Sequence, residues 1–147
     1  MDDFEVSFEV SKDVEAIKRL KARYFRLLDT KDWDGLRGLF TDDLVVDTTG
    51  SGGGVIVGVD AFVGFVSSHL SDAVTVHHGH TPEITLTSPS EATGIWAMED
   101  RIWFANGHAM TGFGHYHETY AKIDGSWRIA SSTLTRLRVD MTGPATA

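Results

Sequence analysis

Apolar residues recur at helical spacing near the start of the chain. They occur every three or four positions, at Val14, Ile17, Leu20, Tyr24, Leu27 and Leu28. This spacing predicts an amphipathic helix that ends near residue 28 or 29. Ser11 is a candidate N-cap for the helix, so residues 1–10 are expected to form a loose leader. The basic residues are expected to face away from the apolar side, namely Lys18, Lys21, Arg23 and Arg26.

Shorter elements are expected over the next forty residues. Asp32 can cap a second, short helix. Residues 44–49 and 55–57 are rich in β-branched side chains and predict two short strands, separated by a flexible turn at 50–54. Asp60 is a candidate N-cap for a third helix.

Strand-like patterns fill the chain from Thr75 onward. Turn signals at 88–90, 106–107 and 124–125 divide this region into four long strands, the last two joins being Asn-Gly and Asp-Gly hairpins. Residues 141–147 are expected to form a loose tail. Helices followed by a run of strands predict an α+β fold, with three helices packed on one face of an antiparallel (mixed) sheet.

The length of these strands predicts a curved sheet around a pocket. Strands usually have about five or six residues, and long antiparallel sheets twist strongly. Gly94, Gly112 and Gly114 lie within strand patterns and permit bulges or bends there. The alternative is a solid core filled by the aromatic residues of this region, Trp96, Trp103, Phe104, Phe113 and Trp127.

Composition narrows the range of partners. The 147 residues fit a single domain. A net charge of −8 disfavours binding to nucleic acid or anionic membranes. The chain has no cysteine, which excludes disulfides and thiolate chemistry. Its acidic N-terminus lacks signal-peptide features and no apolar run is long enough to span a membrane, so we expect a soluble cytoplasmic protein.

Histidines form the most conspicuous polar pattern. Five of the seven fall within residues 77–80 and 115–117. Since alternate residues of a strand share a face, His78 and His80 form one His-x-His pair, and the second cluster forms another. Such pairs can chelate zinc, but no spacing nominates a third ligand, so we expect neither a metal nor another cofactor.

Two further residues are candidates for chemistry. Asp29 ends the first predicted helix. Its purely structural interpretation is a polar helix end or a cap for the next turn. Tyr24 lies on or beside the apolar side of that helix. Its purely structural interpretation is a core tyrosine whose hydroxyl reaches the boundary of the core.

Several segments of the chain also resemble a known protein family. Roughly from residue 11 to 138, the chain resembles the SnoaL-like branch of the nuclear transport factor 2-like superfamily. The segments that carry the resemblance are 23–33, 39–43, 58–62, 76–77 with 82–84, and 125–129. The resemblance implies a cone formed by a curved antiparallel sheet and three helices, in agreement with the element order above.

The resemblance also implies an activity. Several members of this branch are cofactor-free lyases, and scytalone dehydratase, bile-acid 7α-dehydratase and hexachlorocyclohexane dehydrochlorinase look similar in layout. By position, it implies that Asp29 and His77 form an Asp–His base and that Tyr24 lies near the substrate oxygen. A lyase or isomerase acting on a small hydrophobic cyclic molecule, such as a polyketide, steroid or terpenoid, is therefore expected.

One position departs from the dehydrochlorinase pattern. That enzyme has an arginine on its last strand, where this chain has Ser132, which argues against dehydrochlorination. Arg136 lies slightly further along and is a candidate to compensate. Beyond the implied base, the residues expected to contact substrate are Trp96, His108, His115 and Arg136.

Two interpretations stay open at the level of sequence. The first is the enzyme described above. The second is a non-catalytic module of the same fold that binds small molecules or assembles with partners. Under either, a homo-oligomer (dimer or trimer) is expected, because the outer face of a long sheet carries apolar residues that a monomer would expose to water.

Overall fold

The structure, a computed structural model, describes residues 3–144, with side chains from residue 7 onward. Its helices are α1 (Asp3–Asp29), α2 (Trp33–Arg37) and α3 (Val59–Leu70), with a short 3-10 turn η1 (Thr49–Ser51). Its strands are β1 (Phe40–Asp47), β2 (Val55–Val57), β3 (Val74–Ser88), β4 (Glu91–Trp103), β5 (Ala109–Ile123) and β6 (Ser126–Thr142).

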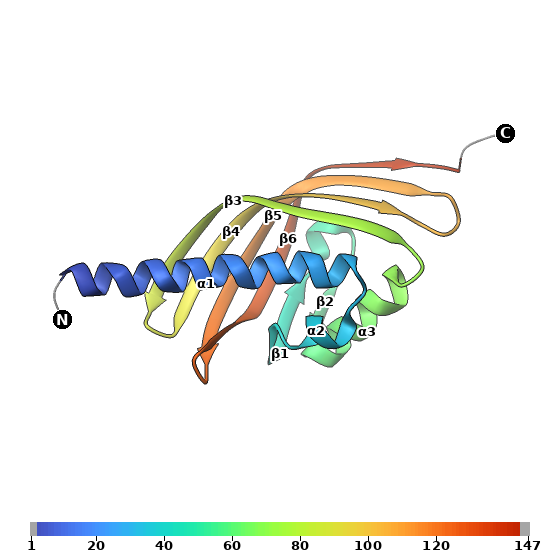
Figure 1. Cartoon of the computed structure of the whole chain (residues 1–147). Coiled ribbons are helices and arrows are strands. Elements are labelled where there is room, and N and C mark those ends of the chain that lie inside the picture. Colours follow the sequence, from blue (N-terminus) through green and yellow to red (C-terminus); the bar gives the residue numbers. More distant parts are fainter. Residues whose placement is uncertain (1–2, 145–147) are drawn as a thin grey trace.

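The strands form one curved sheet in the order β2-β1-β6-β5-β4-β3. All neighbours pair antiparallel except β1 and β6, which are parallel, so the sheet is mixed. Helix α1 lies across the concave face, and α2 and α3 lie near one end of it (Figure 1). The α+β cone expected from the sequence is confirmed, as are the two hairpin turns.

Several predicted boundaries are wrong. Helix α1 begins at Asp3 rather than at Ser11, since no glycine or proline interrupts residues 3–29 and nothing ends the helix earlier. The expected leader is thus helical where it is described, and residues 1–2 lie outside the described residues. Strand β6 continues through Thr142, past the expected start of the tail, and residues 145–147 again lie outside.

The two shorter helices differ in how they start. Asp32 caps α2 as expected, its Oδ1 accepting a hydrogen bond from the Gly35 N–H at 2.9 Å. Helix α3 instead follows Gly58, whose φ of 93° is accessible to glycine, so Asp60 is not its N-cap. Asp60 lies in the first helical turn and pairs with Arg37.

The sheet curves through a β-bulge at one of the expected glycines. The pairing of β5 with β6 shifts between Phe113 and Gly114, which leaves Leu137 as the extra residue. A Cβ on Gly114 would overlap the backbone carbonyl oxygen of Thr135, so the position requires glycine. Gly112 stays in register with β4 and β6, so no bulge occurs there.

The core contains a buried ion pair that the sequence pattern hid. Lys21, expected to face away from the apolar side, is fully buried, and its Nζ donates to Glu118 Oε2 at 2.9 Å. The same nitrogen lies 3.9 Å and 3.7 Å from the ring centroids of Tyr24 and Tyr116. Burial lowers the pKa of Lys21, and the Glu118 carboxylate partly offsets this effect. Lys21 thus anchors α1 to the middle of β5.

Within residues 3–144, no helix combines the length and the apolar character that a membrane span requires.

Self-association stays a prediction. Large apolar side chains are exposed near one end of the sheet, on Val74, Trp103, Leu137, Val139 and Met141. We propose that a second copy of the chain covers them, because closed symmetric pairing removes such surface from water. Light scattering over a range of concentrations tests this proposal, and a monomer at every concentration would rule it out.

The buried pair yields a stability prediction. Lys21→Met leaves Glu118 charged and unpaired in the core, which we expect to lower the free energy of unfolding by about 3–5 kcal/mol. The double variant Lys21→Met/Glu118→Gln removes both charges and should recover part of that loss. Urea unfolding measures both effects.

An exposed neighbour on the same helix provides the control for this experiment. Lys18 is solvent-exposed, so Lys18→Met should change the free energy of unfolding by no more than about 0.5 kcal/mol. Equal stability of Lys21→Met and the unmodified chain would contradict the assigned role of the pair.

Candidate active site

A small cavity lies between the helices and the concave face of the sheet. Its volume is about 110 Å³. Most of its lining is apolar and comes from α1, β1, α3 and β6, for example Leu28, Phe40, Phe62, Val66 and Leu134. Its polar lining includes Tyr24, His77, Asp100, Glu118 and Ser132. A mainly apolar pocket with few polar groups is typical of small-molecule sites.

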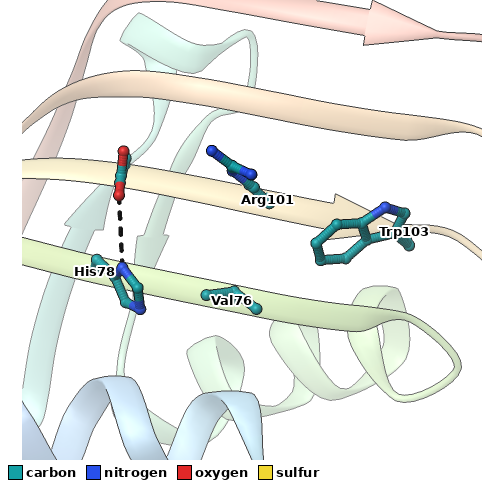
Figure 2. Close-up of a pocket in the computed structure, with 5 residues that line it drawn as sticks. Val76, His78, Arg101 and Trp103 are labelled. Atoms are coloured by element: carbon teal, nitrogen blue, oxygen red, sulfur yellow. Dashed lines mark ion pairs between the residues drawn. The ribbon is translucent and has the colours of Figure 1, made fainter.

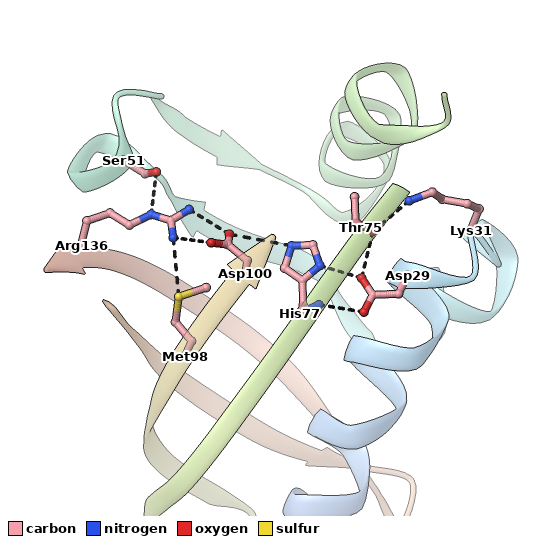
Figure 3. A network of polar contacts seen from close by, with 8 residues as sticks. All are labelled: Asp29, Lys31, Ser51, Thr75, His77, Met98, Asp100 and Arg136. Carbon is pink, nitrogen blue, oxygen red and sulfur yellow. Dashed lines mark hydrogen bonds and ion pairs between the residues drawn. The ribbon is translucent and has the colours of Figure 1, made fainter. Parts of the chain in front are cut away.

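Asp29 and His77 are in direct contact at the edge of this cavity. Asp29 is the last residue of α1, and His77 lies early in β3 (Figure 3). His77 Nδ1 is 2.7 Å from Asp29 Oδ1, and the His77 backbone N–H donates to Asp29 Oδ2 at 2.8 Å. An ionised carboxylate can only accept, so the proton of the neutral ring lies on Nδ1 and Nε2 has a free lone pair.

Further hydrogen bonds hold the Asp29 carboxylate in place. The Thr75 hydroxyl donates to Asp29 Oδ1 at 2.9 Å and accepts from Lys31 Nζ, also at 2.9 Å. Burial raises the pKa of Asp29, but the hydrogen bonds from His77 and Thr75 outweigh burial and leave the pKa below its ordinary value. Asp29 is therefore ionised at neutral pH.

The other side of the His77 ring faces a second carboxylate. Nε2 is 4.0 Å from Asp100 Oδ2, beyond hydrogen-bond distance. Arg136 binds Asp100 in a bidentate manner, with Nη1–Oδ1 and Nη2–Oδ2 distances of 2.8 Å and 3.0 Å. A Cβ on Gly112 would collide with this pair, which explains why β5 has glycine there. Asp100 thus has its charge balanced, and Nε2 has no hydrogen-bond partner among the described residues.

Tyr24 lines the cavity and carries a neutral hydroxyl. Burial raises its pKa well above the ordinary value, and the negative charges of Glu118 and Asp29 raise it further. The phenol therefore stays protonated at any physiological pH and can donate a hydrogen bond.

The structure brings together only some of the residues predicted from sequence. Asp29, His77 and Tyr24 meet at the cavity, and Ser132 lines it. Arg136 lies next to it, but its guanidinium binds Asp100 and Ser51, so it does not take over the role expected for an arginine at Ser132.

Three of the expected substrate contacts do not line this cavity. His115 lies on the outer face, because the inward positions of β5 are those of its neighbours Gly114 and Tyr116. His108 lies in the turn between β4 and β5 and does not line the cavity. Trp96 packs in the core instead, where its indole N–H donates to the Tyr120 hydroxyl at 3.0 Å.

Sequence reasoning missed Asp100 and Glu118, although a signal was present. Each occupies an inward position of a strand whose other inward residues are mostly large and apolar, Trp96 and Met98 on β4 and Tyr116 and Tyr120 on β5. A carboxylate in such a series is costly to bury unless it is paired. Alternation along each strand therefore could have marked both as candidates.

Comparison with known proteins identifies the family of this chain. A model of the SnoaL-like domain family matches residues 9–133. The chain belongs to the SnoaL-like family. It is also 28% identical over 141 residues to FGR4 of Gibberella zeae, a protein assigned as a cyclase, covering 87% of this chain and 94% of that protein. The resemblance inferred from sequence segments is thereby confirmed.

Solved structures agree on the fold of this SnoaL-like domain. A Novosphingobium aromaticivorans protein assigned as a scytalone dehydratase has a TM-score of 0.82 at 20% identity, covering 96% of this chain and 98% of its own. A type 2 hexachlorocyclohexane dehydrochlorinase has a TM-score of 0.84 at 16% identity, covering 96% of each chain. At these identities the likeness establishes the nuclear transport factor 2-like cone alone.

Proposed function

We propose that this SnoaL-like domain is a cofactor-independent lyase or isomerase with the Asp29–His77 pair as its general base. The observation that carries the proposal is the 2.7 Å contact between His77 Nδ1 and Asp29 Oδ1 at the edge of an apolar cavity. The assigned cyclase and dehydratase relatives and the dehydrochlorinase support this class of reaction.

The proposed reaction begins with proton abstraction by His77. Its Nε2 removes a proton from the carbon next to a substrate carbonyl, and Asp29 stabilises the imidazolium that forms. The electron pair then forms a C=C bond as a β-hydroxyl group departs, and the imidazolium returns its proton to that group, so that water leaves. Return of the proton to another carbon gives an isomerisation instead.

Tyr24 and Asp100 assist in different ways. The protonated Tyr24 hydroxyl donates to the carbonyl oxygen as negative charge develops on it. Asp100, held by Arg136, lies 4.0 Å from His77 Nε2, beyond hydrogen-bond distance, and so leaves that lone pair free for the substrate.

The size of the cavity limits the substrate. A cavity of about 150 Å³ can hold a benzene molecule, and this one measures about 110 Å³. Because this volume is the smaller of the two, we propose a small hydrophobic molecule with no more than one ring at the reacting end, and that ring either shifts the lining side chains slightly or extends out of the cavity. A steroid or another fused-ring substrate would require the side chains of α3 to move.

Substitution of the base provides the functional test. We expect the unmodified chain to convert 3-hydroxycyclohexanone, or a larger member of a panel of β-hydroxy ketones, to the enone, or to exchange its α-proton in D₂O, as followed by NMR. His77→Ala should lower the rate by about 10²–10⁴-fold, the usual contribution of general-base catalysis. Asp29→Asn should also lower it, because the carboxylate that orients the ring is lost.

A histidine on the outer face serves as the control. His117→Ala removes an exposed imidazole and should leave the rate unchanged. Neither elimination nor exchange by the unmodified chain on any ketone of the panel would contradict the proposal. Binding of these ketones in the cavity without turnover would instead support the non-catalytic module.

A further inference from the structure

A second cluster of chemistry-bearing side chains lies on the outer face of the sheet. His78 and His80 project from β3 on the face opposite to His77, and Glu99 projects from β4 on the same face. The strand register explains their meeting, because His78 pairs directly with Glu99 and His80 pairs with Ala97, two residues away. The third ligand that the sequence spacing did not nominate therefore comes from the neighbouring strand.

We propose that His78, His80 and Glu99 bind a divalent transition-metal ion of the Zn²⁺ type. Imidazole nitrogens favour zinc, copper and nickel over magnesium and calcium, and two histidines with one carboxylate form a known zinc donor set. The net charge of −8 further favours cation binding. This site is independent of the proposed catalytic function.

The spacing of the donor atoms fits such an ion. His78 Nδ1 and His80 Nε2 lie 3.5 Å and 3.6 Å from Glu99 Oε1. Zinc holds its N and O ligands at about 2.0–2.2 Å in a tetrahedron, which places neighbouring donor atoms about 3.4 Å apart. All three donor atoms lie within 4.8 Å of one another, and the ion pairs of the two histidines among the described residues are with Glu99 itself.

The surroundings leave room to complete the coordination. His78 and Glu99 line a surface pocket of about 320 Å³ together with Val76, Arg101 and Trp103 (Figure 2). The side chains of His78 and His80 are 57% and 53% exposed, so water can reach the ion and fill its open positions. A bound ion would also fasten the edge strand β3 to β4.

The same face of the sheet carries a matched control. His115 and His117 on β5 form another His-x-His pair, with ring centroids 6.3 Å apart against 6.1 Å for His78 and His80. The strand residues paired with them are not acidic, being Ala97, Ile95, Thr135 and Thr133. Glu99 also lies two residues from the partner of His115, but His115 and His117 form no three-donor group with it among the described residues. The two pairs thus differ in whether a carboxylate oxygen lies within reach of both rings.

Calorimetric titration of the tag-free full chain with ZnCl₂ tests the proposal. We expect saturable binding of one ion per chain and a rise in the melting temperature at saturating zinc. Glu99→Gln should weaken binding by at least about tenfold, since even loss of a supporting partner of a ligand costs about 10–100-fold. His78→Ala/His80→Ala should abolish binding, and His115→Ala/His117→Ala should leave it unchanged.

Three results would overturn the proposal. They are the absence of saturable binding to the unmodified chain, unchanged affinity in Glu99→Gln, and loss of binding in His115→Ala/His117→Ala. Since all five side chains lie on the outer face, the variants should remain folded, which thermal unfolding without zinc verifies. A failed titration would leave the elimination assay unaffected, so the two proposals are tested separately.

Discussion

The carboxylate of Asp29 connects the end of α1 to the edge strand β3. It accepts hydrogen bonds from the His77 ring, the His77 backbone and the Thr75 hydroxyl. These contacts fix the orientation of one imidazole at the edge of the cavity between helix and sheet. Without this connection, the apolar pocket would remain but would lack an oriented base.

Two buried ion pairs support the polar side of the pocket. Lys21–Glu118 holds α1 against β5, and Asp100–Arg136 connects β4 with β6 behind the His77 ring. Each charge is paired within hydrogen-bond distance, so its burial is compensated. In an apolar cavity of low dielectric, such fixed charges act more strongly on a developing imidazolium or enolate than they would in water. The core thus contains paired buried charges as well as apolar packing.

Local patterns predicted most of the fold. Alternating strands, the Asn-Gly and Asp-Gly turns and the helical spacing from residue 14 to 28 gave the architecture, because each is decided by neighbours in sequence. The burial of Lys21 was missed, since it depends on a contact with a residue far along the chain. The start of α1 was missed for a local reason, because Ser11 was taken as a cap although nothing interrupts residues 3–29. Lys21 has a basic side chain like those of exposed helix positions, and only its partner Glu118, 97 residues away, shows that it is buried.

The residues of the candidate site were also predicted only in part. Asp29, His77 and Tyr24 were found through a family resemblance. Periodicity alone was compatible with a purely structural role for each of them. Asp100 was missed although alternation along β4 marks it as inward, and its position opposite His77 follows only from the register of β3 and β4. His115 was misplaced for a related reason: the inward or outward direction of β5 residues is set by the sheet and not by the residues themselves.

The central claim is that Asp29 fixes His77 as a neutral base with a free Nε2. Long-range ¹H–¹⁵N correlation NMR of the neutral histidine rings tests it most directly, with His77→Ala used to assign the signals. The structure predicts that the neutral His77 ring carries its proton on Nδ1 and that Asp29→Asn alters this tautomer. A neutral ring protonated on Nε2, or one whose tautomer is unaffected by Asp29→Asn, would contradict the account.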